Sequence, residues 1–184
     1  SLQVFYNEKK VGTLALMKNN IVAFEYDNEW INNGFSISPF SLPLKKQVFI
    51  PKIDPFDGLY GVFSDSLPDG WGRLLVDRML NSQNINPREI SQIDRLAIVG
   101  ETGMGALSYK PEYNLLEDKD YQEDYDNLAL SCKKILNTEH SADLDNLFRL
   151  GGSSGGARPK ILTKIDNEDW IIKFPSSLDD SNIG

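Results

Sequence analysis

The stretch Leu150-Gly151-Gly152-Ser153-Ser154-Gly155-Gly156-Ala157-Arg158-Pro159-Lys160 determines how the rest of the chain is interpreted. Two short apolar runs follow it, at 160–165 and 170–174, and the polar residues 166–169 separate them. This pattern predicts a glycine-rich loop that leads into a β-hairpin. Because glycine has no Cβ, the backbone N–H groups of such a loop can approach an anion closely.

The second run contains one lysine, Lys173, among apolar residues. A glycine-rich loop followed by a strand lysine is the arrangement of a protein-kinase nucleotide lobe, in which the loop covers the phosphates and the lysine holds them by charge. Neither a Walker loop nor a G-x-G-x-x-G motif is present. Glycine content alone therefore also fits a mobile linker before an ordinary hairpin, with Lys173 as an exposed strand lysine.

Several stretches together resemble one family, the HipA serine/threonine kinase toxins. They are, in chain order, Phe63-Ser64-Asp65-Ser66-Leu67-Pro68-Asp69-Gly70-Trp71-Gly72-Arg73-Leu74-Leu75, Asp94-Arg95-Leu96-Ala97-Ile98-Val99-Gly100 running on to Gly103-Met104-Gly105-Ala106-Leu107-Ser108-Tyr109, Ser153-Ser154-Gly155-Gly156-Ala157-Arg158-Pro159-Lys160, and Trp170-Ile171-Ile172-Lys173-Phe174-Pro175. Their order and spread make the resemblance more specific than any one motif.

The resemblance implies an ATP site. Lys173 would hold the α- and β-phosphates, and Ser153, Ser154, Gly155 and Gly156 would belong to a mobile loop over them, with little packing to hold it. Family members phosphorylate a serine in this loop, and Ser153 matches that position, with Ser154 directly beside it. The family also implies magnesium, a DNA-binding antitoxin of the HipB type as partner, and a protein substrate of the translation machinery.

In the family the catalytic and magnesium-binding residues lie in a helical second lobe, which does not follow Ser176–Gly184 here. We therefore expect no catalytic residue in this chain, no phosphotransfer by the chain alone, and weak ATP binding. The alternative is a stand-alone binding or regulatory module that restrains a partner kinase. Whether the chain is a fragment or a short natural protein stays open.

Composition limits the other function classes. The chain has 184 residues, 40% of them hydrophobic, which is enough for a packed core, and a net charge of −8. That charge argues against direct nucleic-acid binding by this chain, because phosphates need a basic surface. One cysteine, Cys132, fits a reducing cytoplasm, and the single histidine, His140, excludes a histidine cluster for a metal. No apolar run is long enough to cross a membrane.

The fold class we predict is α+β: a small antiparallel sheet with packed helices, then helices, the glycine-rich loop and its hairpin. Period-2 patterns predict strands at 2–6, 10–16, 21–26, 47–50 and 105–110. Period-3.6 patterns predict helices at 71–81, from Asn86-Pro87 through Ala97, and at 125–137 and 142–150. We place a boundary near 111–113, between an N-terminal subdomain (1–112) and the start of a kinase-like nucleotide-binding domain (113–184).

Three acidic features have two interpretations each. Asp65 or Asp69 could cap the helix near Trp71, or their turn could contact a partner or the nucleotide lobe. Glu89 and Asp94 could form an acid/base pair, although solvated or ion-paired carboxylates are more common on a helix. The acidic stretch within 111–126 could dock a basic partner, or form an exposed loop and helix start.

Overall fold

The computed structural model describes residues 1–116 and 124–175, and they form two compact units. Unit 1 contains residues 1–67 and 88–114, and unit 2 contains residues 68–87 together with the chain from residue 115 onward. The segment 68–87 precedes the predicted boundary near 111–113, but it packs with the C-terminal part of the chain. The two compact units are defined by which residues pack together. The predicted domain boundary at residue 112 is a different division of the chain, and it stays a prediction.

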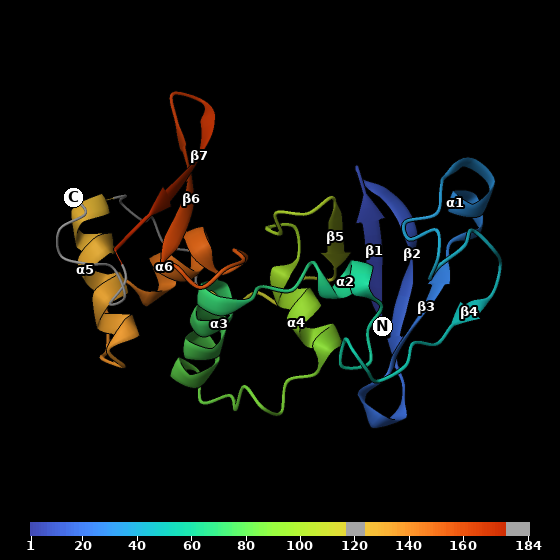
Figure 1. The fold of residues 1–184 in the computed structure, drawn as a ribbon, viewed down its shortest axis with the longest axis horizontal. Coiled ribbons are helices and arrows are strands. Elements are labelled where there is room, and N and C mark those ends of the chain that lie inside the picture. Colours follow the sequence, from blue (N-terminus) through green and yellow to red (C-terminus); the bar gives the residue numbers. More distant parts are fainter. Residues whose placement is uncertain (117–123, 176–184) are drawn as a thin grey trace. The chain divides into compact units, whose positions relative to one another are not determined.

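Unit 1 is built on a five-stranded antiparallel sheet with the strand order β4-β3-β2-β1-β5 (Figure 1). The strands are β1 (Leu2–Tyr6), β2 (Lys9–Leu16), β3 (Val22–Tyr26), β4 (Val48–Phe49) and β5 (Leu107–Lys110). Asn7 and Glu8 join β1 to β2 with φ values of 46° and 63°. Positive φ at both residues is the geometry of a two-residue hairpin turn whose twist matches the strands.

Helices and a buried core complete unit 1. Besides the short 3₁₀ helix at Lys18–Asn20, its helices are α1 (Asn28–Asn33), α2 (Gly61–Ser64) and α4 (Gln92–Val99), which packs against β2 and β5. Val4, Leu14, Phe24, Phe63 and Leu96 are completely buried in this core. The two shortest α-helices, α1 and α2, were not predicted, because four to six residues do not establish a helical period.

Unit 2 packs helices against a two-stranded hairpin. Its elements are α3 (Gly70–Ser82), α5 (Tyr125–Leu136), α6 (Leu144–Gly151), β6 (Lys160–Ile165) and β7 (Glu168–Lys173). Trp71 and Leu75 of α3, Cys132 of α5, Leu147 of α6 and Ile161 of β6 share one buried cluster. The predicted α+β class is therefore confirmed, with a separate small sheet in each unit.

Two predicted element boundaries are wrong. The helix predicted from Asn86-Pro87 begins only at Gln92, because the Ser91 hydroxyl accepts the Asp94 N–H and caps it there. The hairpin turn is Asp166-Asn167 alone, both with positive φ, so Glu168 and Asp169 belong to β7.

The structure describes only part of the acidic stretch within 111–126. Residues 117–123 lie outside the described residues, and so do Ser176–Gly184. Asp124 is described, and its carboxylate accepts the N–H groups of Asp126 and Asn127, which makes it the N-cap of α5. At this end the stretch is a helix start, as one of its two interpretations proposed.

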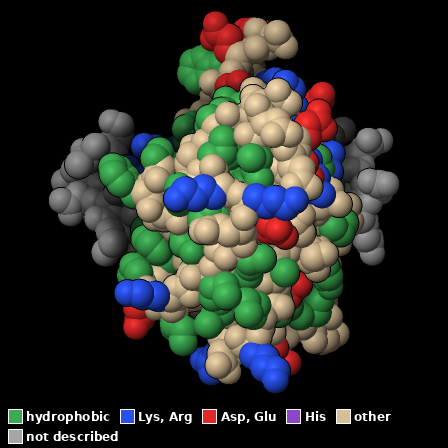
Figure 2. All heavy atoms as spheres, turned by 90° about the vertical axis from the view of Figure 1, so that its right-hand side faces the viewer, with side chains coloured by type: hydrophobic (Ala, Val, Ile, Leu, Met, Phe, Trp, Pro, Cys, Tyr) green, Lys and Arg blue, Asp and Glu red, His purple; other side chains and the backbone are tan. Residues whose placement is uncertain are grey.

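Several large apolar side chains in and near β4 along the sequence are exposed, and Figure 2 shows one face of the molecule on which hydrophobic side chains are interspersed with charged ones. The most exposed are Phe35, Phe40, Val48, Ile50 and Ile53. β4 has only two residues, so it offers little free edge for pairing with another chain. No helix of the described residues is long and apolar enough to cross a bilayer.

Candidate phosphate-binding loop

The glycine-rich loop, residues 152–159, connects α6 to β6 in unit 2. Its first half is packed into the protein: Ser154 is fully buried, and its hydroxyl donates a hydrogen bond to the Gly151 carbonyl at 2.6 Å. Ser153 is partly exposed, and Gly155 to Arg158 are exposed. The expectation of a loop with little packing is therefore wrong for its first half.

The beginning of α3 fixes the second half of the loop. The Trp71 N–H donates to the Gly156 carbonyl at 2.9 Å, and the Trp71 indole Nε1 donates to the Lys160 carbonyl at 3.0 Å. The Gly156 N–H in turn donates to the Asp69 carboxylate. Three hydrogen bonds thus join residues 69–71 to residues 156–160.

Glycine on both sides allows this close approach. A Cβ on Gly72 would lie 2.2 Å from the Ser154 carbonyl oxygen, and one on Gly70 would lie 2.6 Å from the Gly156 carbonyl oxygen. Gly70 and Gly156 also have φ values of 45° and 83°, which glycine adopts without strain. Only glycine at these positions lets helix α3 and the loop meet backbone to backbone.

Two lysines face each other where the loop enters the hairpin. Lys160 and Lys173 are direct partners across the β6–β7 ladder, which places their side chains on the same face. Burial, and after it the charge of Lys173, lower the pKa of the Lys160 ammonium below its usual range, while Asp69 opposes part of that shift. The Lys160 ammonium donates to the Gly155 carbonyl. The hairpin therefore presents two adjacent positive charges beside the loop.

All the predicted site residues lie in this region, but they differ in accessibility. Lys173, Gly155 and Gly156 are exposed, Ser153 is partly exposed, and Ser154 is buried. Lys160 lies among them, although its position at the exit of the loop gave it no separate prediction. Only the hairpin register, which pairs it with Lys173, identifies it.

Asp69 was considered only as a helix cap or a contact residue. Its side chain makes no cap bond to α3, so the predicted cap is wrong. Asp65 is not a cap of α3 either, since it ends α2. The contact interpretation is correct for Asp69, whose carboxylate accepts the Gly156 N–H of the loop. A contact between residues 87 positions apart leaves no local signal in the sequence.

The Asp94 carboxylate and possible metal ligands are the other candidates for a site. Asp94 accepts a hydrogen bond from the Ser91 hydroxyl at 2.5 Å, so its carboxylate belongs to the start of α4. Within residues 1–116 and 124–175, no three or more His, Cys, Asp or Glu side chains gather in a way that could hold a metal ion.

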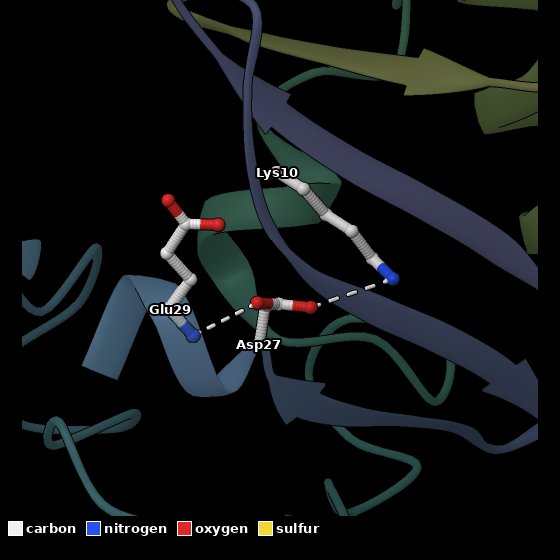
Figure 3. A network of polar contacts seen from close by, with 3 residues as sticks. All are labelled: Lys10, Asp27 and Glu29. Atoms are coloured by element: carbon white, nitrogen blue, oxygen red, sulfur yellow. Dashed lines mark hydrogen bonds and ion pairs between the residues drawn. The ribbon is translucent and has the colours of Figure 1, made fainter. Parts of the chain in front are cut away.

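Unit 1 has a pocket of its own, of about 670 Å³, between the β1–β2 turn and α1. Tyr6, Trp30 and Phe35 line it and contact one another edge to face. Figure 3 shows the polar contacts at its wall, where Asp27 accepts the Glu29 N–H at 2.9 Å and pairs with the Lys10 ammonium at 3.5 Å. This pocket contains none of the predicted site residues.

The chain is similar to one known protein family and to a solved structure. Residues 2–110 match the model of the HipA N-terminal domain. The chain also matches HipA of Shewanella oneidensis MR-1, solved in a toxin–antitoxin complex of HipA, HipB and operator DNA, with 18% sequence identity and a TM-score of 0.52. The match covers 96% of this chain and 38% of that chain. A search of the curated proteins found no match.

The family match covers more than half of the chain, and it includes the sheet of unit 1 and helix α3 with Asp69 and Trp71. The structural match supports the same fold and extends over almost all of the chain. The chain therefore belongs to the HipA family, as the resemblance of its motifs predicted.

Proposed function

We propose that this chain is the N-terminal part of an ATP-dependent serine/threonine protein kinase, and that Ser153, Gly155 and Gly156 with Lys160 and Lys173 bind the phosphates of ATP. One observation carries the proposal: Lys160 and Lys173 are paired directly across the hairpin at the exit of the glycine-rich loop. The proposal accounts for the two facing lysines, which a linker before an ordinary hairpin does not require.

The lysine pair is unfavourable without an anion. Like charges placed directly opposite each other destabilise a sheet, and partial burial of Lys160 adds to that cost. The lowered pKa of Lys160 has the same two causes. A phosphate group between the ammonium groups would relieve the repulsion and gain two charge-assisted hydrogen bonds. Such a pair is thus better suited to binding a phosphate than to holding the hairpin together.

The residues fit the triphosphate of ATP, which would supply the transferable phosphoryl group. Lysine charge and backbone N–H groups are the usual phosphate ligands of kinase nucleotide lobes. Our proposal assigns the catalytic carboxylate and the magnesium ligands to a part of a longer protein that this chain does not contain. ATP binding to the 184-residue chain should then be weak, because the contacts assigned to that other part would be absent.

The relatives support a toxin–antitoxin role. The matched Shewanella HipA was solved with HipB and operator DNA, and our chain spans 38% of its length. We assign to the longer protein a DNA-binding partner of the HipB type, a substrate in the translation machinery and a cytoplasmic location. A net charge of −8 is consistent with DNA contacts made by the partner and not by this chain.

Autophosphorylation of the loop belongs to the same proposal, with Ser153 as the acceptor. Ser153 is partly exposed, whereas Ser154 is buried and its hydroxyl is already bonded to the Gly151 carbonyl. The geometry supports Ser153 as the acceptor because a kinase can reach its hydroxyl without unfolding the loop. A phosphate there would add roughly −1.5 to −2 charge beside the site and would repel the phosphates of ATP.

The test compares Lys173→Ala with Lys164→Ala in a longer protein that includes the second lobe. Lys164 is a matched control, because it lies on the same hairpin but pairs with Asp169 at 3.7 Å. We expect Lys173→Ala to abolish ATP-dependent phosphorylation and Lys164→Ala to leave it unchanged, with both variants folded by circular dichroism. Full kinase activity in the Lys173→Ala protein would refute the phosphate site.

Two observations favour a second function, a module that restrains a partner kinase. The family match ends at residue 110, before the loop, and unit 1 has its own pocket beside Trp30. One measurement distinguishes the two functions. If this chain is a restraining module, the chain with Lys173→Ala should still inhibit a separately expressed kinase lobe.

A further inference from the structure

A carboxylate of the protein itself binds to the glycine-rich loop. The Gly156 N–H is one of the groups expected to face a phosphate, but it donates to the Asp69 carboxylate at the start of α3. Asp69, Gly155 and Gly156 are all exposed, so solvent and dissolved anions reach this contact. A carboxylate and a phosphate are the same kind of acceptor for a backbone N–H.

Resting on the proposed phosphate site, we infer that Asp69 occupies the anion-binding position of the glycine-rich loop, and that a phosphate binds there only by displacing its carboxylate. Asp69 is then a positioning residue that occupies the Gly156 N–H when no nucleotide is bound and so weakens anion binding. Its role is separate from that of the lysines, which attract the anion.

The neighbouring lysine is held in a similar way. The Lys160 ammonium donates to the Gly155 carbonyl, and the negative charge of Asp69 acts on the same ammonium. An incoming phosphate must therefore take the Gly156 N–H from Asp69 and share Lys160 with the loop. It must also overcome the repulsion of the Asp69 carboxylate as it approaches.

Displacement of Asp69 does not require the loop to unfold. The Gly156 and Lys160 carbonyls accept their hydrogen bonds from Trp71 through separate contacts, at 2.9 and 3.0 Å. Ser154 is held by the Gly151 carbonyl. Rotation of one exposed carboxylate thus frees the Gly156 N–H while the backbone of the loop keeps its place.

The experiment is a titration of the 184-residue chain with sodium tripolyphosphate, followed on backbone amide signals by NMR. The variants are Asp69→Asn, which removes the charge at constant shape, and Asp65→Asn, which makes the same charge change at the exposed end of α2. We expect Asp69→Asn to bind tripolyphosphate about fivefold more tightly, the ratio that corresponds to about 1 kcal/mol, and Asp65→Asn to match the wild type.

A second measurement needs no anion. Hydrogen exchange of the Gly156 amide should be faster in Asp69→Ala than in Asp65→Ala, because only Asp69→Ala removes its acceptor. Equal exchange rates would overturn the inference.

Unchanged or weaker tripolyphosphate binding by Asp69→Asn would also overturn the inference. The same titration of Lys173→Ala tests the phosphate site separately: loss of binding in Lys173→Ala would leave that site standing. Binding by Lys173→Ala that is as tight as that of the wild type would instead refute the proposed phosphate site. The two failures are therefore distinguishable.

Discussion

The indole Nε1 of Trp71 donates a hydrogen bond to the backbone carbonyl of Lys160 at 3.0 Å, across 89 residues of sequence. Trp71 is 1% exposed and belongs to the core of unit 2, whereas Lys160 begins the hairpin at the exit of the glycine-rich loop. One side chain thus joins the hydrophobic core to the backbone of the candidate phosphate site. The stability of the core and the position of the loop are therefore coupled.

Replacement of Trp71 by phenylalanine tests this coupling. Phe keeps most of the apolar volume but cannot donate, so the buried Lys160 carbonyl loses a partner at a cost of about 1–3 kcal/mol. We expect a lower urea midpoint with an unchanged m-value. Trp170→Phe is the control, because Trp170 is 48% exposed on the same hairpin. Equal midpoints for the two variants would contradict a structural role for the indole N–H.

Gly72→Ala should destabilise the chain, although alanine is the better helix former. In a free helix the change would stabilise by about 0.5–1 kcal/mol. Here the new Cβ would lie 2.2 Å from the Ser154 carbonyl, so α3 and the loop must separate, at a cost of about 1–3 kcal/mol. Gly105→Ala, with nothing within 4 Å of its Cβ, is the control. A stabilised Gly72→Ala protein in urea unfolding would show that the approach is looser than described.

Mass spectrometry of the longer kinase incubated with Mg-ATP should find phosphate on Ser153. The buried Ser154 hydroxyl, bonded at 2.6 Å to the Gly151 carbonyl, should remain unmodified. Ser154→Ala should therefore still be phosphorylated, and Ser153→Ala should not. Phosphate found only on Ser154 would mean that the loop opens before it reacts, and phosphate on neither serine of an active kinase would exclude autophosphorylation of the loop.

Cys132 should make stability depend on alkaline pH. Burial raises the pKa of its thiol from 9.0 to about 12. Since the folded pKa lies above the unfolded value, the stabilisation is fully present below pH 9. It is lost as the pH rises from about 9 towards 12, at about 1.4 kcal/mol per pH unit from this group. Urea unfolding of the wild type and Cys132→Ala across this range should show a steeper loss in the wild type; parallel curves would contradict it.

The strands of unit 1 were predictable because their signals are local. Alternating apolar residues gave β1, β2 and β3 to within one residue, and Asn7-Glu8 marked the turn between the first two strands. The hairpin after the glycine-rich loop was found by the same pattern. Its turn was assigned four residues instead of two, because Glu168 and Asp169 are polar strand residues that resemble a turn.

The start of α4 shows where local signals compete. Pro87 is a good first-turn residue, but the helix begins five positions later, where Ser91 and Asp94 form a capping pair. Both signals are visible in the sequence, and the structure uses the second: Ser91 caps the helix, which buries Ile93 and Leu96 in the core of unit 1. A first-turn proline alone is therefore a weaker marker of a helix start than a side chain that caps it.

The sequence by itself determined the α+β class, the family, and the position of the glycine-rich loop with Lys173, because these depend on residue type and on spacing along the chain. Tertiary structure alone decided that α3 packs with the C-terminal residues and that Lys160 faces Lys173. It also decided that Asp69 holds the Gly156 N–H. These relationships join residues up to 89 positions apart, and their free energy comes from burial and hydrogen bonds formed only after the chain has folded.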